Sequence, residues 1–186
     1  FLLLNVPAAV GVYLLGTPIS QVLYGTRFAG PAITALAPAI LFLGLHQVST
    51  ALLQGLGHTR VPMCNMLLSL IVKVGLLWTL TAIPAYNIRA AWATDANLAA
   101  AGLANLGFLY YTDRLTLPWK DLARITVSAV VMGGAVYALG PMLSGVLSNR
   151  ILWLMAEVML GAGVYGLMLV LTRELRISDF KRREQP

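Results

Sequence analysis

The sequence predicts an all-α protein, a polytopic membrane bundle of six transmembrane helices. Of its 186 residues, 59% are hydrophobic and only 11% are charged, whereas a soluble domain is about 45–50% apolar and about 25% charged. Six apolar stretches are each long enough to cross about 30 Å of hydrocarbon, which takes roughly 20 helical residues. The basic residues lie at the ends of these stretches and in the tail, as is typical of membrane proteins.

The first three apolar stretches cover residues 1–24, 31–55 and 61–83. Pro7 and Pro18 are expected to break the first stretch, which Tyr24-Gly25-Thr26-Arg27 then closes. Pro62 fits the first turn of the third stretch, because a proline at the start of a helix loses no intrahelical hydrogen bond.

The last three apolar stretches cover residues 89–110, 122–147 and 151–172. The fourth is rich in alanine, and Gly133-Gly134 and Gly140-Pro141 predict bends in the fifth. Four spans over 1–110 are therefore expected to be followed by a cytoplasmic loop at 111–121, two further spans over 122–172, and a polar, basic tail at 173–186.

The distribution of Lys and Arg predicts the orientation, because cytoplasmic loops carry an excess of these residues. One side of the predicted bundle holds Arg27, Arg89 and Arg150. The other side, which we assign to the cytoplasm together with both ends of the chain, holds Arg60, Arg114, Lys120, Arg124, Arg173, Arg176, Lys181, Arg182 and Arg183. The thirteenth basic residue, Lys73, belongs to neither side.

Several chemistries are not expected. The net charge of +6 does not indicate nucleic-acid binding, because the basic residues flank apolar runs. Cys64 is the single cysteine, so no disulfide within the chain and no Cys-based metal site is possible. Gly55-Leu56-Gly57 lacks the Gly-Lys-Ser/Thr of a P-loop. With no catalytic constellation, we expect no enzyme activity, no metal and no cofactor.

Lys73 lies at the middle of the stretch LLSLIVKVGLLW, about 18 Å from either end of its span. A charged residue at this depth costs about 2.5–3.5 kcal/mol on insertion scales and usually faces a bundle interior or a water cavity. Asn65 and Ser69 precede Lys73 at four-residue steps, so the three share one helix face. This polar stripe predicts either a structural ion pair or a transport cavity.

Asp95 is the expected partner of Lys73. If the third and fourth spans form a hairpin about residue 86, the two residues differ in depth by only about 6 Å. We therefore expect a Lys73–Asp95 pair or a shared water cavity. For Asp95, and for Glu157 in the last span, a structural or interfacial role is favoured over a transport role.

The second span carries another polar stripe, made of Gln47, Thr50 and Gln54 at i, i+3 and i+7. Interhelical hydrogen bonding is the favoured role for this stripe, and a substrate site is the alternative. His46 lies beside the stripe, where proton carriage is the less favoured reading. In the fourth span, Asn97 and Asn105 are eight residues apart.

Four segments together resemble a known transporter family. Residues 5–15, NVPAAVGVYLL, are followed by Pro18-Ile19 and Leu23-Tyr24-Gly25, and residues 49–62 read STALLQGLGHTRVP. These segments, with Lys73 and Ala90-Ala91-Trp92-Ala93-Thr94, resemble MurJ/MviN-type lipid II flippases and, more closely, their polysaccharide-biosynthesis and stage V sporulation protein B relatives. The resemblance covers about residues 1–95.

That resemblance places the chain in the multidrug/oligosaccharidyl-lipid/polysaccharide exporter superfamily, whose members of this branch have fourteen spans. It implies the last six spans of a bacterial plasma-membrane flippase, in which 1–110 belongs to the C-terminal lobe. Alternating access would move a lipid-linked sugar, driven by a coupling cation or the membrane potential, and the last two spans would line a groove for the lipid tail. Arg89 departs from the family, which commonly has glycine there, and the arginines of the first lobe match no position here.

Two other functions stay open. The first is a cation-coupled multidrug exporter of the same superfamily. The second is a membrane scaffold that recruits cell-wall synthesis enzymes without transporting anything. For the flippase, the candidate cavity residues are Lys73, Asp95, Asn65, Ser69, Gln47, Thr50, Gln54 and His46.

Overall fold

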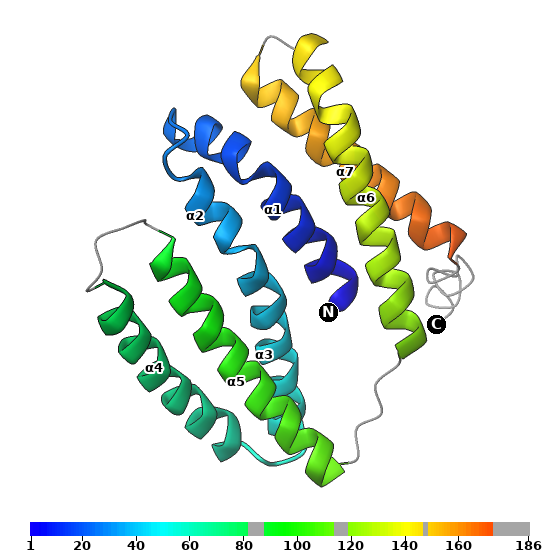
Figure 1. Ribbon diagram of the computed structural model, residues 1–186. Helices are drawn as coiled ribbons and strands as arrows, with labels where there is room; N and C mark the ends of the chain where they lie inside the picture. Colours follow the sequence, from blue (N-terminus) through cyan, green and yellow to red (C-terminus); the bar gives the residue numbers. More distant parts are fainter. Residues whose placement is uncertain (82–87, 114–118, 147–148, 173–186) are drawn as a thin grey trace, which may run out of the picture. The chain divides into compact units, whose positions relative to one another are not determined.

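A computed structural model describes residues 1–81, 88–113, 119–146 and 149–172, and every element in these ranges is helical (Figure 1). The helices are α1 (Leu2–Tyr24), α2 (Gly30–Ala35), α3 (Ala37–Gly55), α4 (Arg60–Thr81), α5 (Arg89–Asp113), α6 (Trp119–Val146) and α7 (Arg150–Leu171). The predicted all-α membrane bundle is thus confirmed. The chain divides into two compact units, Phe1–Leu117 and Pro118–Pro186, which are described separately.

Five helical segments are long and apolar enough to cross a membrane, and they match five of the six predicted stretches. They are Leu2–Tyr24, Gly30–Gly55, Arg60–Leu80, Lys120–Gly140 and Arg150–Leu171. The sixth, α5, has 25 residues and a length of about 37 Å, but it is not among the segments apolar enough to cross a membrane, because polar and charged residues such as Asp95, Asn97 and Asn105 lower its mean hydropathy. Helices α5 and α6 extend into the expected loop at 111–121, whose middle lies outside the described residues, as does the tail at 173–186.

Helix α1 is continuous from Leu2 to Tyr24, so the break expected at Pro7 and Pro18 is wrong. Each proline removes one backbone hydrogen bond, but the bonds on either side still hold the helix in register. The helix ends at Gly25, which has a φ of 69° and donates its N–H to the Gln21 carbonyl at 3.1 Å. This left-handed conformation is open to glycine without steric cost, which explains why the helix stops there.

The second predicted span is divided into α2 and α3 at Leu36, which the sequence analysis did not anticipate. Pro38 stands in the first turn of α3, where it has no N–H to donate and its ring excludes the carbonyl four residues earlier. The Ala39 N–H starts the next helix by donating to the Leu36 carbonyl at 3.1 Å. The two helices therefore count as one membrane segment with a break near its start.

In the first unit, α3 packs against both α1 and α5, and α4 packs against α5 (Figure 1). Glycines allow the close approaches: a Cβ at Gly102 of α5 would lie 3.3 Å from the His46 backbone nitrogen of α3. Helix α4 contributes little buried surface, and its exposed apolar side chains include Leu67, Leu70, Ile71, Val74 and Trp78. Arg89 at the start of α5 donates from Nη1 to the Leu80 carbonyl of α4 at 2.6 Å, which ties the two helix ends together.

The second unit is a hairpin of α6 and α7. Helix α6 runs without interruption through Gly133-Gly134 and Gly140-Pro141, where bends were expected. Gly161 of α7 allows the hairpin to close, because a Cβ there would lie 3.2 Å from the Val136 side chain of α6. The buried side chains of this hairpin are Ile125, Ala129, Met132, Val136, Tyr165 and Leu169, with the polar Ser128 and Glu157 among them.

Candidate polar site on α3, α4 and α5

Asn105 of α5 is fully buried and joins three helices through its amide group. Its Oδ1 accepts a hydrogen bond from Asn65 Nδ2 of α4 at 2.8 Å. Its Nδ2 donates to Thr50 Oγ1 of α3 at 3.1 Å and lies 3.5 Å from His46 Nδ1. An amide carries two donors and one acceptor oxygen, so a single asparagine can serve all three neighbours. We call His46, Thr50, Asn65 and Asn105 the Asn105 cluster.

The cluster brings together three residues that the sequence analysis proposed for a cavity, His46, Thr50 and Asn65. The residue that connects them, Asn105, was noted in the sequence but was not among the proposed site residues. The sequence does point to Asn105, because Asn97 and Asn105 are two amide side chains, eight residues apart, in an otherwise Ala-rich helix. Helical periodicity alone does not reveal that a side chain faces two neighbouring helices at once.

The stripe of Gln47, Thr50 and Gln54 divides in the structure. Thr50 contacts α5, whereas Gln47 and Gln54 are exposed on the surface of the first unit. On a helix with about 100° per residue, positions i and i+7 differ by only about 20°, but position i+3 is turned about 60° away from i. The two glutamines therefore share a direction that Thr50 does not share.

The Asn65–Asn105 bond sets the register of the antiparallel pair α4 and α5. Each four-residue step forward along α4 corresponds to a four-residue step back along α5. Ser69 thus lies opposite Ala101, and both are 2% exposed. The next step places Lys73 at the depth of Asn97. Ser69 itself donates to the Met66 carbonyl of its own helix at 2.8 Å, so it contributes little polarity to the interface.

Two oxygen atoms near this depth are buried and without a hydrogen-bond partner in the part of the chain that the structure describes. They are Oδ1 of Asn97 and Oδ1 of Asp95. The Asp95 carboxyl group lies close to the backbone N–H of Ala39, at the start of α3. A carboxylate at this end of a helix is favoured by the helix dipole. Asp95 therefore faces α3.

The expected Lys73–Asp95 ion pair is not formed. Within the described ranges, the salt bridge joins Arg124 to Asp121 at 3.9 Å, in the second unit. The depth of Asp95 is close to that of Lys73, which made the pairing look feasible. However, Asp95 is two residues from Asn97, the residue at the depth of Lys73, and a two-residue step turns a side chain by about 200° around the helix. Asp95 is on the side of α5 toward α3, and Asn97 is turned away from that side. Lys73 is half-buried and has no carboxylate within salt-bridge distance among the described residues.

This arrangement contains groups that can bind a polar or anionic ligand. Its polar groups include the Lys73 ammonium, the Asp95 carboxyl group and the amides of Asn65, Asn97 and Asn105. Oδ1 of Asp95 and Oδ1 of Asn97 have no hydrogen-bond partner among the described residues. The described residues include no group of three His, Cys, Asp or Glu side chains that could hold a metal ion. No protein-family model, curated protein or solved structure matches the chain.

Proposed function

We propose that this chain is part of a transporter that moves a lipid-linked oligosaccharide across the bilayer by alternating access between two lobes. The observation that carries the proposal is Lys73, a half-buried lysine at the middle of a membrane helix that no carboxylate among the described residues neutralises. A cation at this depth is costly, and such residues usually mark a substrate pathway.

The chemistry of a lipid-linked oligosaccharide fits the groups along α4 and α5. Its phosphate or pyrophosphate is anionic, and the Lys73 ammonium would bind it as a point charge. Its sugar presents hydroxyls, which would donate hydrogen bonds to the unpartnered Asn97 oxygen at the depth of Lys73. Its tail is apolar, like the exposed face of α4 that includes Leu70 and Val74. Three different parts of one ligand thus correspond to three neighbouring surfaces.

The resemblance of residues 1–95 to polysaccharide-biosynthesis and lipid II flippases supports the same function. On that basis we place the protein in the plasma membrane of a bacterial cell, with its C-terminus in the cytoplasm. The bias of nine basic residues against three supports this orientation. The energy source would be a coupling cation or the membrane potential.

A cation-coupled multidrug exporter is the second candidate. It is favoured by the buried and unpartnered Asp95 Oδ1, because a carboxylate oxygen is a suitable ligand for a small hard cation. In that case the transported compound would carry no phosphate, so Lys73 would not bind an anionic group of the substrate.

Reconstitution of the full-length protein into liposomes tests the choice between the two functions. We expect a labelled lipid-linked oligosaccharide in the inner leaflet to become accessible to an added enzyme, while a labelled phospholipid does not. Protein-free liposomes are the control. Ion-driven efflux of a cationic dye without any movement of the lipid-linked sugar would establish the exporter instead.

A further inference from the structure

The hairpin of α6 and α7 buries a carboxyl group that plays no part in the polar site of the first unit. Glu157 of α7 is only 3% exposed, although α7 is otherwise one of the most apolar segments of the chain. A structural or interfacial role was expected for this residue, and its burial between two helices is compatible with the structural one. The chemistry of the buried carboxyl group carries the argument further.

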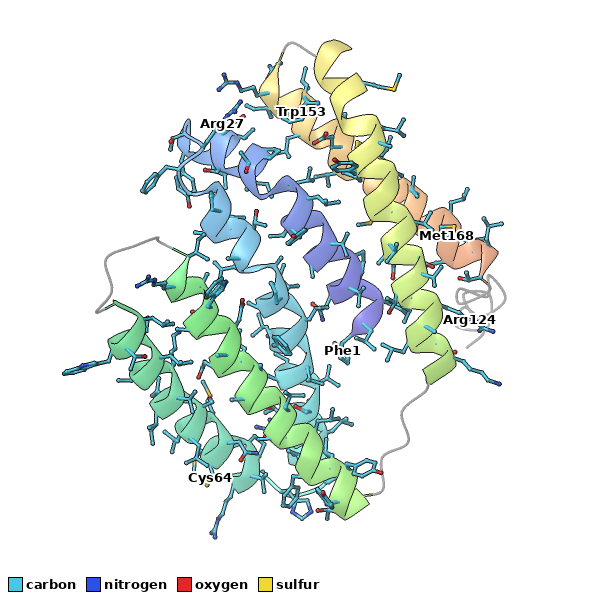
Figure 2. All side chains as sticks on the ribbon, in the orientation of Figure 1. Phe1, Arg27, Cys64, Arg124, Trp153 and Met168 are labelled. Carbon is cyan, nitrogen blue, oxygen red and sulfur yellow. The ribbon has the colours of Figure 1, made fainter. Side chains whose placement is uncertain are left out.

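The hairpin is built around this carboxyl group. A Cβ atom at Gly140 of α6 would overlap Glu157 Oε1, so the missing side chain of the glycine makes the space that the carboxyl group occupies. Trp153 lies one turn before Glu157 on α7, and its Nε1–H donates to the Gly140 carbonyl at 3.3 Å. Trp153 lies near the end of the hairpin where the chain passes from α6 to α7 (Figure 2).

The charge of this carboxyl group is not compensated within the described part of the hairpin. Glu157 Oε2 is buried and has no hydrogen-bond partner among the described residues. On α7, Arg150 is exposed and about 10 Å away along the helix, and Tyr165 is about 12 Å away in the other direction. On α6, Tyr137 is 77% exposed, and the charged residues Lys120, Asp121 and Arg124 lie at the far end, about 24 Å or more from Gly140.

A carboxylate in such surroundings is unfavourable, because an unpaired buried charge costs several kcal/mol. A metal ion does not offer an alternative, since a hard cation such as Ca²⁺ takes about 6–8 oxygen ligands. Among the described residues, Glu157 is not part of any group of three His, Cys, Asp or Glu side chains that could hold a metal ion. Addition of one proton removes the charge and turns an orphan oxygen into a donor.

We propose that Glu157 is a proton-binding site inside the membrane, held in the protonated form by the pocket of Gly140 and Trp153. The site lies wholly in the second unit, and it does not depend on which substrate the protein transports. Protonation and deprotonation would change the free energy of the closed hairpin, because only the neutral form is compatible with the buried position.

A hydrophobic carbodiimide tests this proposal on the full-length protein in membranes. The reagent reacts with protonated carboxyl groups: the O–H adds across its C=N bond, and the adduct rearranges to a stable N-acylurea. We expect mass spectrometry to find one reagent molecule on the peptide that contains Glu157 at neutral pH, with labelling falling as the pH rises. A water-soluble carbodiimide should leave this peptide unmodified.

Glu157→Gln should lose the label, while Asp121→Asn, which removes an exposed carboxyl group of α6, should keep it. Elution of each variant as a single species in size-exclusion chromatography controls for folding. An unlabelled Glu157 in the folded wild-type protein, or labelling of Glu157 only by the water-soluble reagent, would overturn the proposal.

The role of Gly140 has a matched control on the same helix. Gly140→Ala places a methyl group where Glu157 Oε1 lies, whereas a Cβ at Gly134 meets nothing within 4 Å. We expect Gly140→Ala to lower labelling of Glu157 at neutral pH by about tenfold, which corresponds to about 1.4 kcal/mol in the free energy of protonation. Gly134→Ala should leave the labelling unchanged. Equal labelling in the two variants would show that the pocket does not hold the carboxyl group.

Discussion

Lys73→Met in the full-length protein is expected to reduce the movement of lipid-linked oligosaccharide by about 10- to 100-fold. Methionine keeps the length and the apolar stem of lysine but removes the ammonium group. A hydrogen bond to a charged group contributes about 1.5–3 kcal/mol, which corresponds to this loss if Lys73 binds the anionic group during transport. The measurement is the rate of substrate accessibility in proteoliposomes that contain equal amounts of protein.

The same variant should retain or increase its thermal stability, because it removes a half-buried charge that lacks a salt bridge among the described residues. Lys73→Arg, which keeps the charge, should retain most of the transport. Ile71→Met, on the exposed face of the same helix, should have no effect. Full transport by Lys73→Met would assign the lysine to a structural role and would contradict its proposed part in binding the anionic group.

Asn105→Leu should have the largest effect on stability of any single change in the first unit. It replaces a fully buried amide by an apolar group of similar size and removes the hydrogen bonds to Asn65 of α4 and Thr50 of α3. Each buried group left without a partner costs about 1–3 kcal/mol, and interhelical hydrogen bonds in membranes contribute about 0.6–2 kcal/mol each. We expect a loss of about 1–3 kcal/mol in the free energy of unfolding in mixed micelles.

Ser69→Ala is the matched control for Asn105→Leu. Ser69 is also buried, but its hydroxyl bonds to a carbonyl of its own helix. Its removal leaves no orphan group on another helix, so a change below about 0.5 kcal/mol is expected. If both variants unfold like the wild type, the Asn105 cluster does not hold α3, α4 and α5 together.

The ends of the helices could be predicted well from the sequence because local chemistry determines them. Gly25 ends α1 through a left-handed backbone conformation, and Pro62 lies in the first turn of α4 as expected. The effects of prolines within the apolar stretches were harder to predict. Pro7 and Pro18 leave α1 continuous, whereas Pro38 accompanies a break at Leu36. The same residue type has both outcomes, so a proline within an apolar stretch does not by itself predict a break.

The polar site could be predicted only in part, because it depends on rotation around α5 as well as on depth. The stripe on α4 correctly pointed to Asn65, which bonds across to α5. The depth of Asp95 suggested a pair with Lys73, but the carboxyl group is turned toward Ala39 of α3. Asn105 was not selected because its two partners, Thr50 and Asn65, come from helices whose relative register the sequence does not contain.

The central claim is that Lys73 faces a polar path that the substrate occupies. Protection of a cysteine at this position from a water-soluble maleimide tests it most directly, in a full-length protein whose exposed Cys64 has been replaced by serine. We predict that Lys73→Cys reacts and that lipid-linked oligosaccharide slows the reaction, whereas Ile71→Cys on the exposed apolar face does not react. A cysteine at position 73 that stays unreactive, or that reacts equally with and without the substrate, would contradict the claim.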